Sequence, residues 1–132
     1  MRKVRNFVNG QHVDAKDGRT LALVNPATGE EFGTSPLSSA ADVDAAMSSA
    51  AAAFDEWKDT TPSERSRALL RIADALESRA DELIALEVEN TGKPVAMTAS
   101  EEIPPMIDQI RFFAGAARML EGKASAEYMR NM

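Results

Sequence analysis

The spacing of hydrophobic residues changes once along the chain, from short apolar stretches to a helical repeat. Asn9-Gly10 separates the first two stretches, and both of its residues tolerate the positive φ angles of a hairpin turn. Thr20–Val24 is rich in β-forming residues and is stopped by Asn25-Pro26, because proline cannot donate to a β-ladder. A turn at residues 27–30 then leads into a returning strand. The pattern therefore predicts a β-hairpin region over residues 1–36.

Helical spacing begins at Ser38 and indicates two well-marked helices. The first is expected from about Ala40 to Trp57, behind a capping pair of Ser39 and Asp42. Its apolar residues share one face: Val43, Ala46, Met47, Ala50, Phe54 and Trp57. The second starts at Thr61-Pro62-Ser63-Glu64, where threonine can cap the helix and proline suits its first position. Its apolar stripe is formed by Leu69, Ile72, Ala73 and Leu76.

Two further helices are predicted to complete a helical region over residues 38–122. One begins near Asp81, whose carboxylate suits the positive end of a helix, and runs to about Glu89. The other repeats apolar residues every three or four positions from Met106 and ends at Gly122.

Pro104 and Pro105 leave the start of this last helix open. Because each lacks an amide hydrogen, they mark either its beginning or a kink within a longer helix. Residues 123–132 are polar without a period, and we expect a loose tail there.

Composition limits the chain to one modest domain. Of its 132 residues 44% are hydrophobic, but many of these are alanines, which bury little apolar area, so the core is expected to be thin. The net charge of −6 is spread among basic residues, which favours a solvated surface and argues against nucleic-acid binding. No apolar run reaches the roughly 18 residues of a membrane span, and no secretory leader is recognisable, so we expect a cytoplasmic protein with no membrane contact.

The residues alone offer little catalytic chemistry. The chain has no cysteine, no Gly-rich phosphate-binding motif, and a single histidine, His12, which is expected to be a solvated or edge-strand residue. The acidic pair Glu101-Glu102 has two interpretations: helix capping, or a carboxylate that faces a pocket and attracts a cationic ligand group. Asp108 has the same two interpretations. Phe112-Phe113-Ala114-Gly115 indicates close packing of another element.

Three motifs give the chain a family resemblance. Asn25-Pro26-Ala27-Thr28-Gly29, Thr91-Gly92-Lys93-Pro94 and Arg111-Phe112-Phe113-Ala114-Gly115, in this order, resemble the N-terminal part of NAD(P)-dependent aldehyde dehydrogenases. The resemblance extends over about residues 6–128. Three stretches are similar to the γ-aminobutyraldehyde dehydrogenase branch: Glu102-Ile103-Pro104, Arg111-Phe112-Phe113-Ala114-Gly115-Ala116-Ala117-Arg118 and Glu127-Tyr128. It implies an α/β fold of the aldehyde dehydrogenase type, in which a β-hairpin region and about four helices wrap a Rossmann-like cofactor domain. Homo-oligomers, dimers or tetramers, are implied as well.

The reaction implied by the resemblance is the oxidation of a small-molecule aldehyde to a carboxylic acid with NAD. In this family a cysteine thiolate attacks the carbonyl, an asparagine and a backbone amide hold the oxyanion, and a glutamate activates water. All of these groups belong to stretches beyond this sequence, so we predict no catalytic and no cofactor-binding residue within it. We expect the chain to be the opening portion of a longer enzyme and to be inactive alone.

Two sites in this chain follow from the resemblance. An acidic residue near Glu101-Glu102 is placed to meet the ammonium group of an aminoaldehyde, and we select Glu102 first and Asp108 second. A structural site for a monovalent cation is implied at the carbonyls of Leu23 and Val24 together with Asn90. Because Asn90 stands where the family has an aspartate, the site lacks a negative charge.

Two other functions remain open at this point. Betaine-aldehyde dehydrogenase is a near neighbour within the enzyme class, and the sequence does not separate its substrate from γ-aminobutyraldehyde. A free-standing helical interaction module, derived from the family and without catalysis, is the alternative from a different class. Cooperative unfolding of a monodisperse chain would favour the module, and aggregation would favour the enzyme segment.

Overall fold

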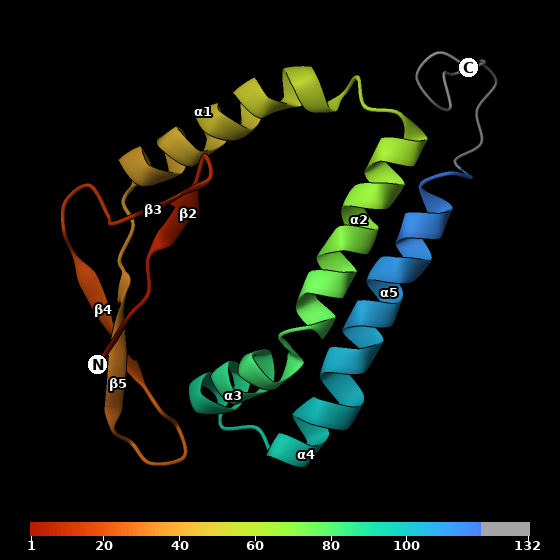
Figure 1. Ribbon diagram of the computed structural model, residues 1–132. Coiled ribbons are helices and arrows are strands. Elements are labelled where there is room, and N and C mark those ends of the chain that lie inside the picture. Colours follow the sequence, from red (N-terminus) through yellow and green to blue (C-terminus); the bar gives the residue numbers. More distant parts are fainter. Residues whose placement is uncertain (120–132) are drawn as a thin grey trace. The chain divides into compact units, whose positions relative to one another are not determined.

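A computed structural model describes residues 1–119, which fall into two compact units (Figure 1). The first unit is Met1–Asp59, and it holds the strands and α1 (Ala40–Trp57). The second begins at Thr60 and holds the later helices. The division thus falls inside the stretch predicted to be helical, because α1 groups with the strands.

The strands of the first unit follow the turn signals of the sequence. The strands β2 (Asn6–Val8) and β3 (Gln11–Val13) form an antiparallel hairpin. Asn9 and Gly10 form its turn with φ angles of 51° and 72°, as the Asn-Gly pair predicts. The strand β4 (Thr20–Val24) pairs antiparallel with β5 (Glu31–Pro36), which confirms both predicted strands.

One short strand was not predicted. The strand β1 (Arg2–Lys3) pairs parallel with β5, so that the sheet has the order β1-β5-β4. Gly33 of β5 is buried opposite Arg2, and a Cβ atom there would lie 2.5 Å from the Arg2 carbonyl oxygen. Glycine therefore permits the close approach of β1.

The helix α1 begins where the capping pair predicts. Asp42 accepts hydrogen bonds from the backbone amide of Ser39 at 2.8 Å and from its hydroxyl at 2.7 Å. The other oxygen of Asp42 accepts from the Lys16 amide at 2.9 Å, which ties the preceding loop to the helix start. No residue of α1 is buried, and its apolar face stays largely exposed.

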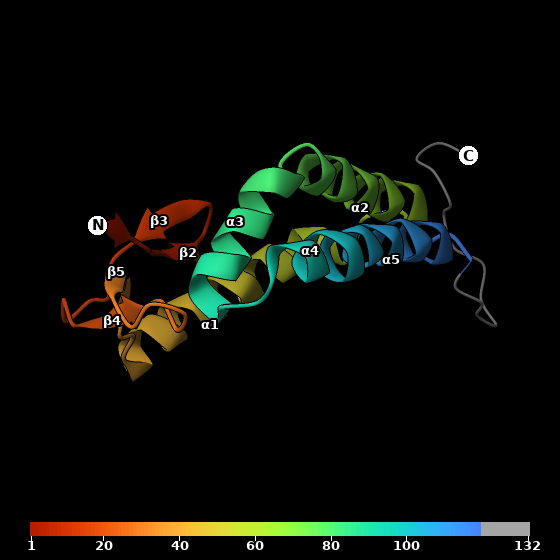
Figure 2. The same cartoon turned by 90° about the horizontal axis from the view of Figure 1, so that it is seen from below.

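The second unit is built around two helices that lie side by side, α2 (Pro62–Glu77) and α5 (Ile103–Ala116) (Figures 1 and 2). The helix α3 (Ala80–Thr91) packs near one end of this pair. Ala73 of α2 and Ile103 and Ile107 of α5 form the buried cluster. Partly buried residues around it are Leu76, Ala80, Leu83, Ile84 and Ile110. The predicted second and third helices are thereby confirmed.

A continuous helical stretch precedes the proline pair. The short helix α4 (Val95–Met97) runs through a π-helical turn, η1 (Thr98–Glu102), into α5 (Figure 2). Both interpretations of Pro104 and Pro105 hold in part: the two prolines lie in the first turn of α5, and α5 continues a helical stretch that starts at Val95.

The end of the last helix differs from the prediction. The helix α5 ends at Ala116, and not at Gly122, with Ala117 and Arg118 in a turn. Gly115 lies one residue before this end, and glycine is a poor helix former. The predicted loose tail, residues 123–132, lies outside the described residues. No helix within residues 1–119 combines the length and the hydrophobicity that crossing a bilayer requires.

Candidate functional site

Glu102, the residue selected for substrate binding, lies at the end of the π-turn with its carboxylate already engaged. Both of its oxygens accept hydrogen bonds from the Lys93 ammonium group, at 2.8 and 3.0 Å. Its side chain is 29% exposed, so it is partly shielded but still reachable from solvent. The position therefore suits an ammonium group, and here Lys93 supplies one.

Lys93 contacts a second carboxylate. Its ammonium group donates to Glu87 of α3 at 3.0 Å, so that Glu87, Lys93 and Glu102 form what we call the charge triad. These hydrogen bonds, first that to Glu102 and then that to Glu87, raise the pKa of Lys93 and keep it positively charged. With two carboxylates and one ammonium group, the charge triad carries one net negative charge.

The backbone around Lys93 explains how three separate elements meet. Gly92 ends α3 in the left-handed conformation, with φ of 73°, and donates its amide hydrogen to Val88 at 2.9 Å. This cap reverses the chain, and the Lys93 side chain returns to α3 at Glu87, six positions earlier. The π-turn brings Glu102 to the same ammonium group.

Asp108 and Glu101 take no part in the hydrogen bonds of the charge triad. Asp108 is exposed on α5. Glu101 is also exposed, and it accepts a hydrogen bond from the Ser100 hydroxyl at 3.2 Å. Of the three acidic residues considered from sequence, Glu102 is the one that the charge triad includes.

The residues proposed for a monovalent cation belong to different units. Leu23 and Val24 lie in β4, at an irregularity where the pairing with β5 shifts register. Asn90 is exposed near the end of α3 in the second unit. The cation site stays a prediction. His12 is exposed in β3 and packs edge-on against Phe7 at 5.3 Å between ring centroids, as expected for a solvated strand residue.

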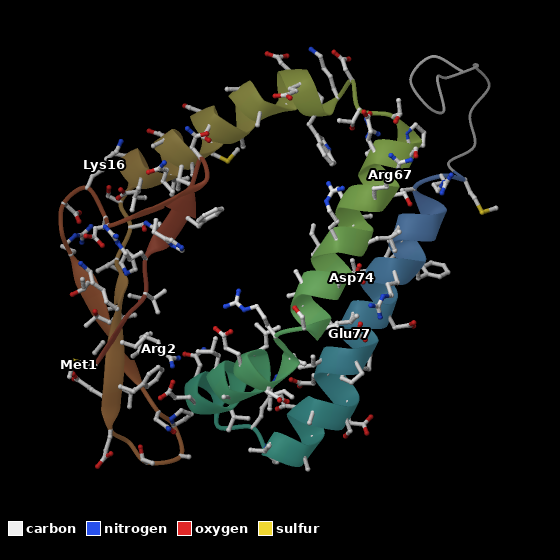
Figure 3. All side chains as sticks on the ribbon, in the orientation of Figure 1. Met1, Arg2, Lys16, Arg67, Asp74 and Glu77 are labelled. Carbon is white, nitrogen blue, oxygen red and sulfur yellow. The ribbon has the colours of Figure 1, made fainter. Side chains whose placement is uncertain are left out.

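Three ion-pairing residues have no signal in the sequence that marks them as such. Lys93 stands there only as part of a family motif, and Glu87 belongs to no motif. Arg111 of α5 also stands only within a motif, yet it contacts Asp74 at 3.0 Å and Glu77 at 2.6 Å on α2 (Figure 3). The spacing from α2 to Arg111 gives no local signal for such contacts.

The comparison with protein families matches most of the chain. Residues 12–132 match the model of the aldehyde dehydrogenase family. The chain therefore belongs to the aldehyde dehydrogenase family, which confirms the resemblance seen in its motifs. The γ-aminobutyraldehyde branch stays a prediction.

Solved structures agree with this assignment. The NAD-dependent aldehyde dehydrogenase from Sinorhizobium meliloti is 38% identical, with a TM-score of 0.87 over 92% of this chain and 25% of that chain. PnpE, solved in complex with nicotinamide adenine dinucleotide, is 34% identical, with a TM-score of 0.89 over 94% of this chain and 26% of that chain. The chain thus spans about a quarter of the length of the aldehyde dehydrogenases it matches.

The dinucleotide that the family uses does not fit the residues at hand. The described part of the chain has no Gly-rich loop between a strand and a helix, and its one parallel strand pair, β1 with β5, is joined through strands and not through a helix. The chain also has no cysteine.

Proposed function

We propose that this chain is the N-terminal structural segment of an NAD-dependent aldehyde dehydrogenase. The observation that carries the proposal is the family match over residues 12–132, together with the span of about a quarter of the matched enzymes. The thiol that attacks the aldehyde and the pocket that binds NAD then lie in the other three quarters. The chain supports catalysis by packing and by shaping access for the substrate.

The exposed apolar surface supports this role. Phe54 and Trp57 at the end of α1 are 60% and 50% exposed, and Phe112 of α5 is 69% exposed. Surfaces of this kind are usually covered by another part of a protein. The rest of the enzyme is the natural cover of this surface.

We further propose that the enzyme is homo-oligomeric and cytoplasmic. We also propose that it binds the structural cation near Leu23, Val24 and Asn90.

The substrate that we propose is γ-aminobutyraldehyde. Glu102 supports this choice because its carboxylate, partly shielded from water, already accepts two hydrogen bonds from an ammonium group. Betaine aldehyde is the second candidate. Its trimethylammonium group has no N–H, so a contact with Glu102 would be purely coulombic.

A grafted enzyme tests this proposal. This chain replaces the matching segment of the Sinorhizobium meliloti enzyme, and aldehyde oxidation is followed as NADH formation. In this background we expect Glu102→Gln to raise KM for γ-aminobutyraldehyde about tenfold, since a hydrogen bond between charged groups is lost. KM for butyraldehyde, which has no charge, should change little.

Asp108→Asn is the matched control, because it removes an exposed carboxylate from the neighbouring helix. It should leave both KM values unchanged. Equal effects of Glu102→Gln on the two aldehydes would rule out the ammonium contact, and a selective effect of Asp108→Asn alone would move the contact to that residue.

A further inference from the structure

We propose that the net charge of the charge triad sets the preference for positively charged aldehydes, with Lys93 weakening and Glu87 restoring the attraction of Glu102 for a substrate ammonium group. This inference rests on the proposed role of Glu102. It assigns specificity to Lys93 and Glu87, two residues that act through Glu102 and not on the reacting carbonyl.

The first step is the competition for Glu102. The Lys93 ammonium group lies 2.8 and 3.0 Å from the two Glu102 oxygens, so it takes one acceptor direction of each. A carboxylate has further lone-pair directions free for a second donor. A substrate ammonium group that used them would also meet the positive charge of Lys93. Lys93 therefore weakens the attraction for such a substrate.

The second step is the division of the Lys93 charge. Glu87 accepts from the same ammonium group at 3.0 Å, which is nearly as short as the contacts to Glu102. Lys93 is thus shared between two carboxylates, and the charge triad keeps one net negative charge. Without Glu87 the pair of Lys93 and Glu102 would be neutral. Glu87 therefore restores attraction at Glu102 without a contact to the substrate.

The third step is the fixed geometry of the charge triad. The Lys93 backbone is held by the Gly92 cap of α3, and its amide donates to the Thr91 hydroxyl at 3.4 Å. Glu102 belongs to η1, which is anchored by the fully buried Thr98, whose hydroxyl donates to the Pro94 carbonyl at 3.2 Å. The backbone is thus held at Lys93 and at Glu102. Removal of one charge therefore changes the electric field at the Glu102 carboxylate more than it changes the position of that carboxylate.

The test uses substitutions that change the charge of the triad in opposite directions. In the grafted enzyme, Lys93→Met makes the triad more negative by one charge, and Glu87→Gln makes it neutral. The side chains are 29–39% exposed, so solvent screens the effect, and we expect changes of about two- to fivefold in KM. KM for γ-aminobutyraldehyde should fall in Lys93→Met and rise in Glu87→Gln.

Controls separate charge from structure. Lys93→Arg keeps the charge and should keep the KM of the unsubstituted graft. KM for butyraldehyde should not change in any of the three variants, and higher salt should reduce the differences for the cationic aldehyde. If the two residues had a merely structural role, each substitution would change KM for both aldehydes together. Lys93→Met and Glu87→Gln would then also change KM in the same direction, and this result would overturn the inference.

The outcome for Glu102→Gln distinguishes this inference from the function on which it rests. If Glu102→Gln has no selective effect, the ammonium contact itself fails, and the inference fails with it. If Glu102→Gln is selective but Glu87→Gln does not raise KM for the cationic aldehyde, the contact stands and only the charge-triad inference is wrong. Glu87→Gln keeps the test decisive even if Lys93→Met does not fold.

Discussion

Gly33 shows how a single residue holds an element in place. A Cβ atom at this position would lie 2.5 Å from the Arg2 carbonyl oxygen, and a backbone oxygen cannot turn away as a flexible side chain does. We expect Gly33→Ala to displace β1 and to destabilise the first unit by about 1–3 kcal/mol, the usual cost of overpacking. The measurement is the denaturant midpoint of the grafted enzyme by circular dichroism.

Gly115→Ala is the control for this prediction. A Cβ atom there meets nothing within 4 Å, and alanine is the better helix former, so this variant should be neutral or stabilising by up to about 1 kcal/mol. An unchanged midpoint in Gly33→Ala would show that β1 does not depend on the missing Cβ.

At the residue scale the sequence singles out Glu102 as a candidate but gives no sign of its ion pair with Lys93. An acidic pair before a proline pair is visible in the linear pattern, and the proposed role in substrate binding comes from the family resemblance alone. Lys93 lies nine positions before Glu102 and six after Glu87, spacings that no single helix brings together. The contact of Lys93 with Glu87 and Glu102 depends on the Gly92 cap and on the π-turn. The hydrophobic pattern of the sequence does not reveal the π-turn, because that turn depends on tertiary packing.

At the element scale, the start of α1 carries a pH-sensitive contact. The amide and the hydroxyl of Ser39, followed by the Lys16 amide, lower the pKa of Asp42 below its ordinary value of 3.8. A carboxyl whose pKa is lower in the folded state contributes stability at pH values above 3.8. That contribution is lost as the pH falls through the folded-state pKa.

Asp42→Asn tests this contribution. In the grafted enzyme, we expect the variant to unfold at a lower denaturant midpoint than the unsubstituted graft at neutral pH. The difference between the two should shrink as the pH falls toward the acidic range. Asp44→Asn, which alters an exposed carboxylate on the same helix, is the control and should show a much smaller difference. A difference for Asp42→Asn that stays constant over the whole pH range would contradict this role of the charge.

Elements with local signals were predictable, and elements without them were not. The Asn9-Gly10 turn and the Ser39 and Thr61 caps each lie within a few residues of the structure they determine, and each is predictable from the sequence. The strand β1 is two residues long and polar, and it exists only because β5 lies beside it. The π-turn likewise has no compositional signature.

At the scale of the whole chain, the buried core is thin, as the alanine content indicates. Within residues 1–119 the buried hydrophobic side chains are Ala15, Ala73, Ile103, Ile107 and Ala114. Larger apolar residues, such as Phe54 and Phe112, stay mostly exposed. The family could be predicted from ordered motifs, but the division after Asp59 could not, because it depends on which elements contact each other.

The most direct test of the central claim compares aldehyde oxidation by the purified chain alone with oxidation by the enzyme into which it has been grafted. The account predicts no NADH formation and no NAD binding by the chain alone, and oxidation of γ-aminobutyraldehyde by the grafted enzyme. Turnover by the chain alone would contradict the account. So would a grafted enzyme that folds and binds NAD yet oxidises no aldehyde.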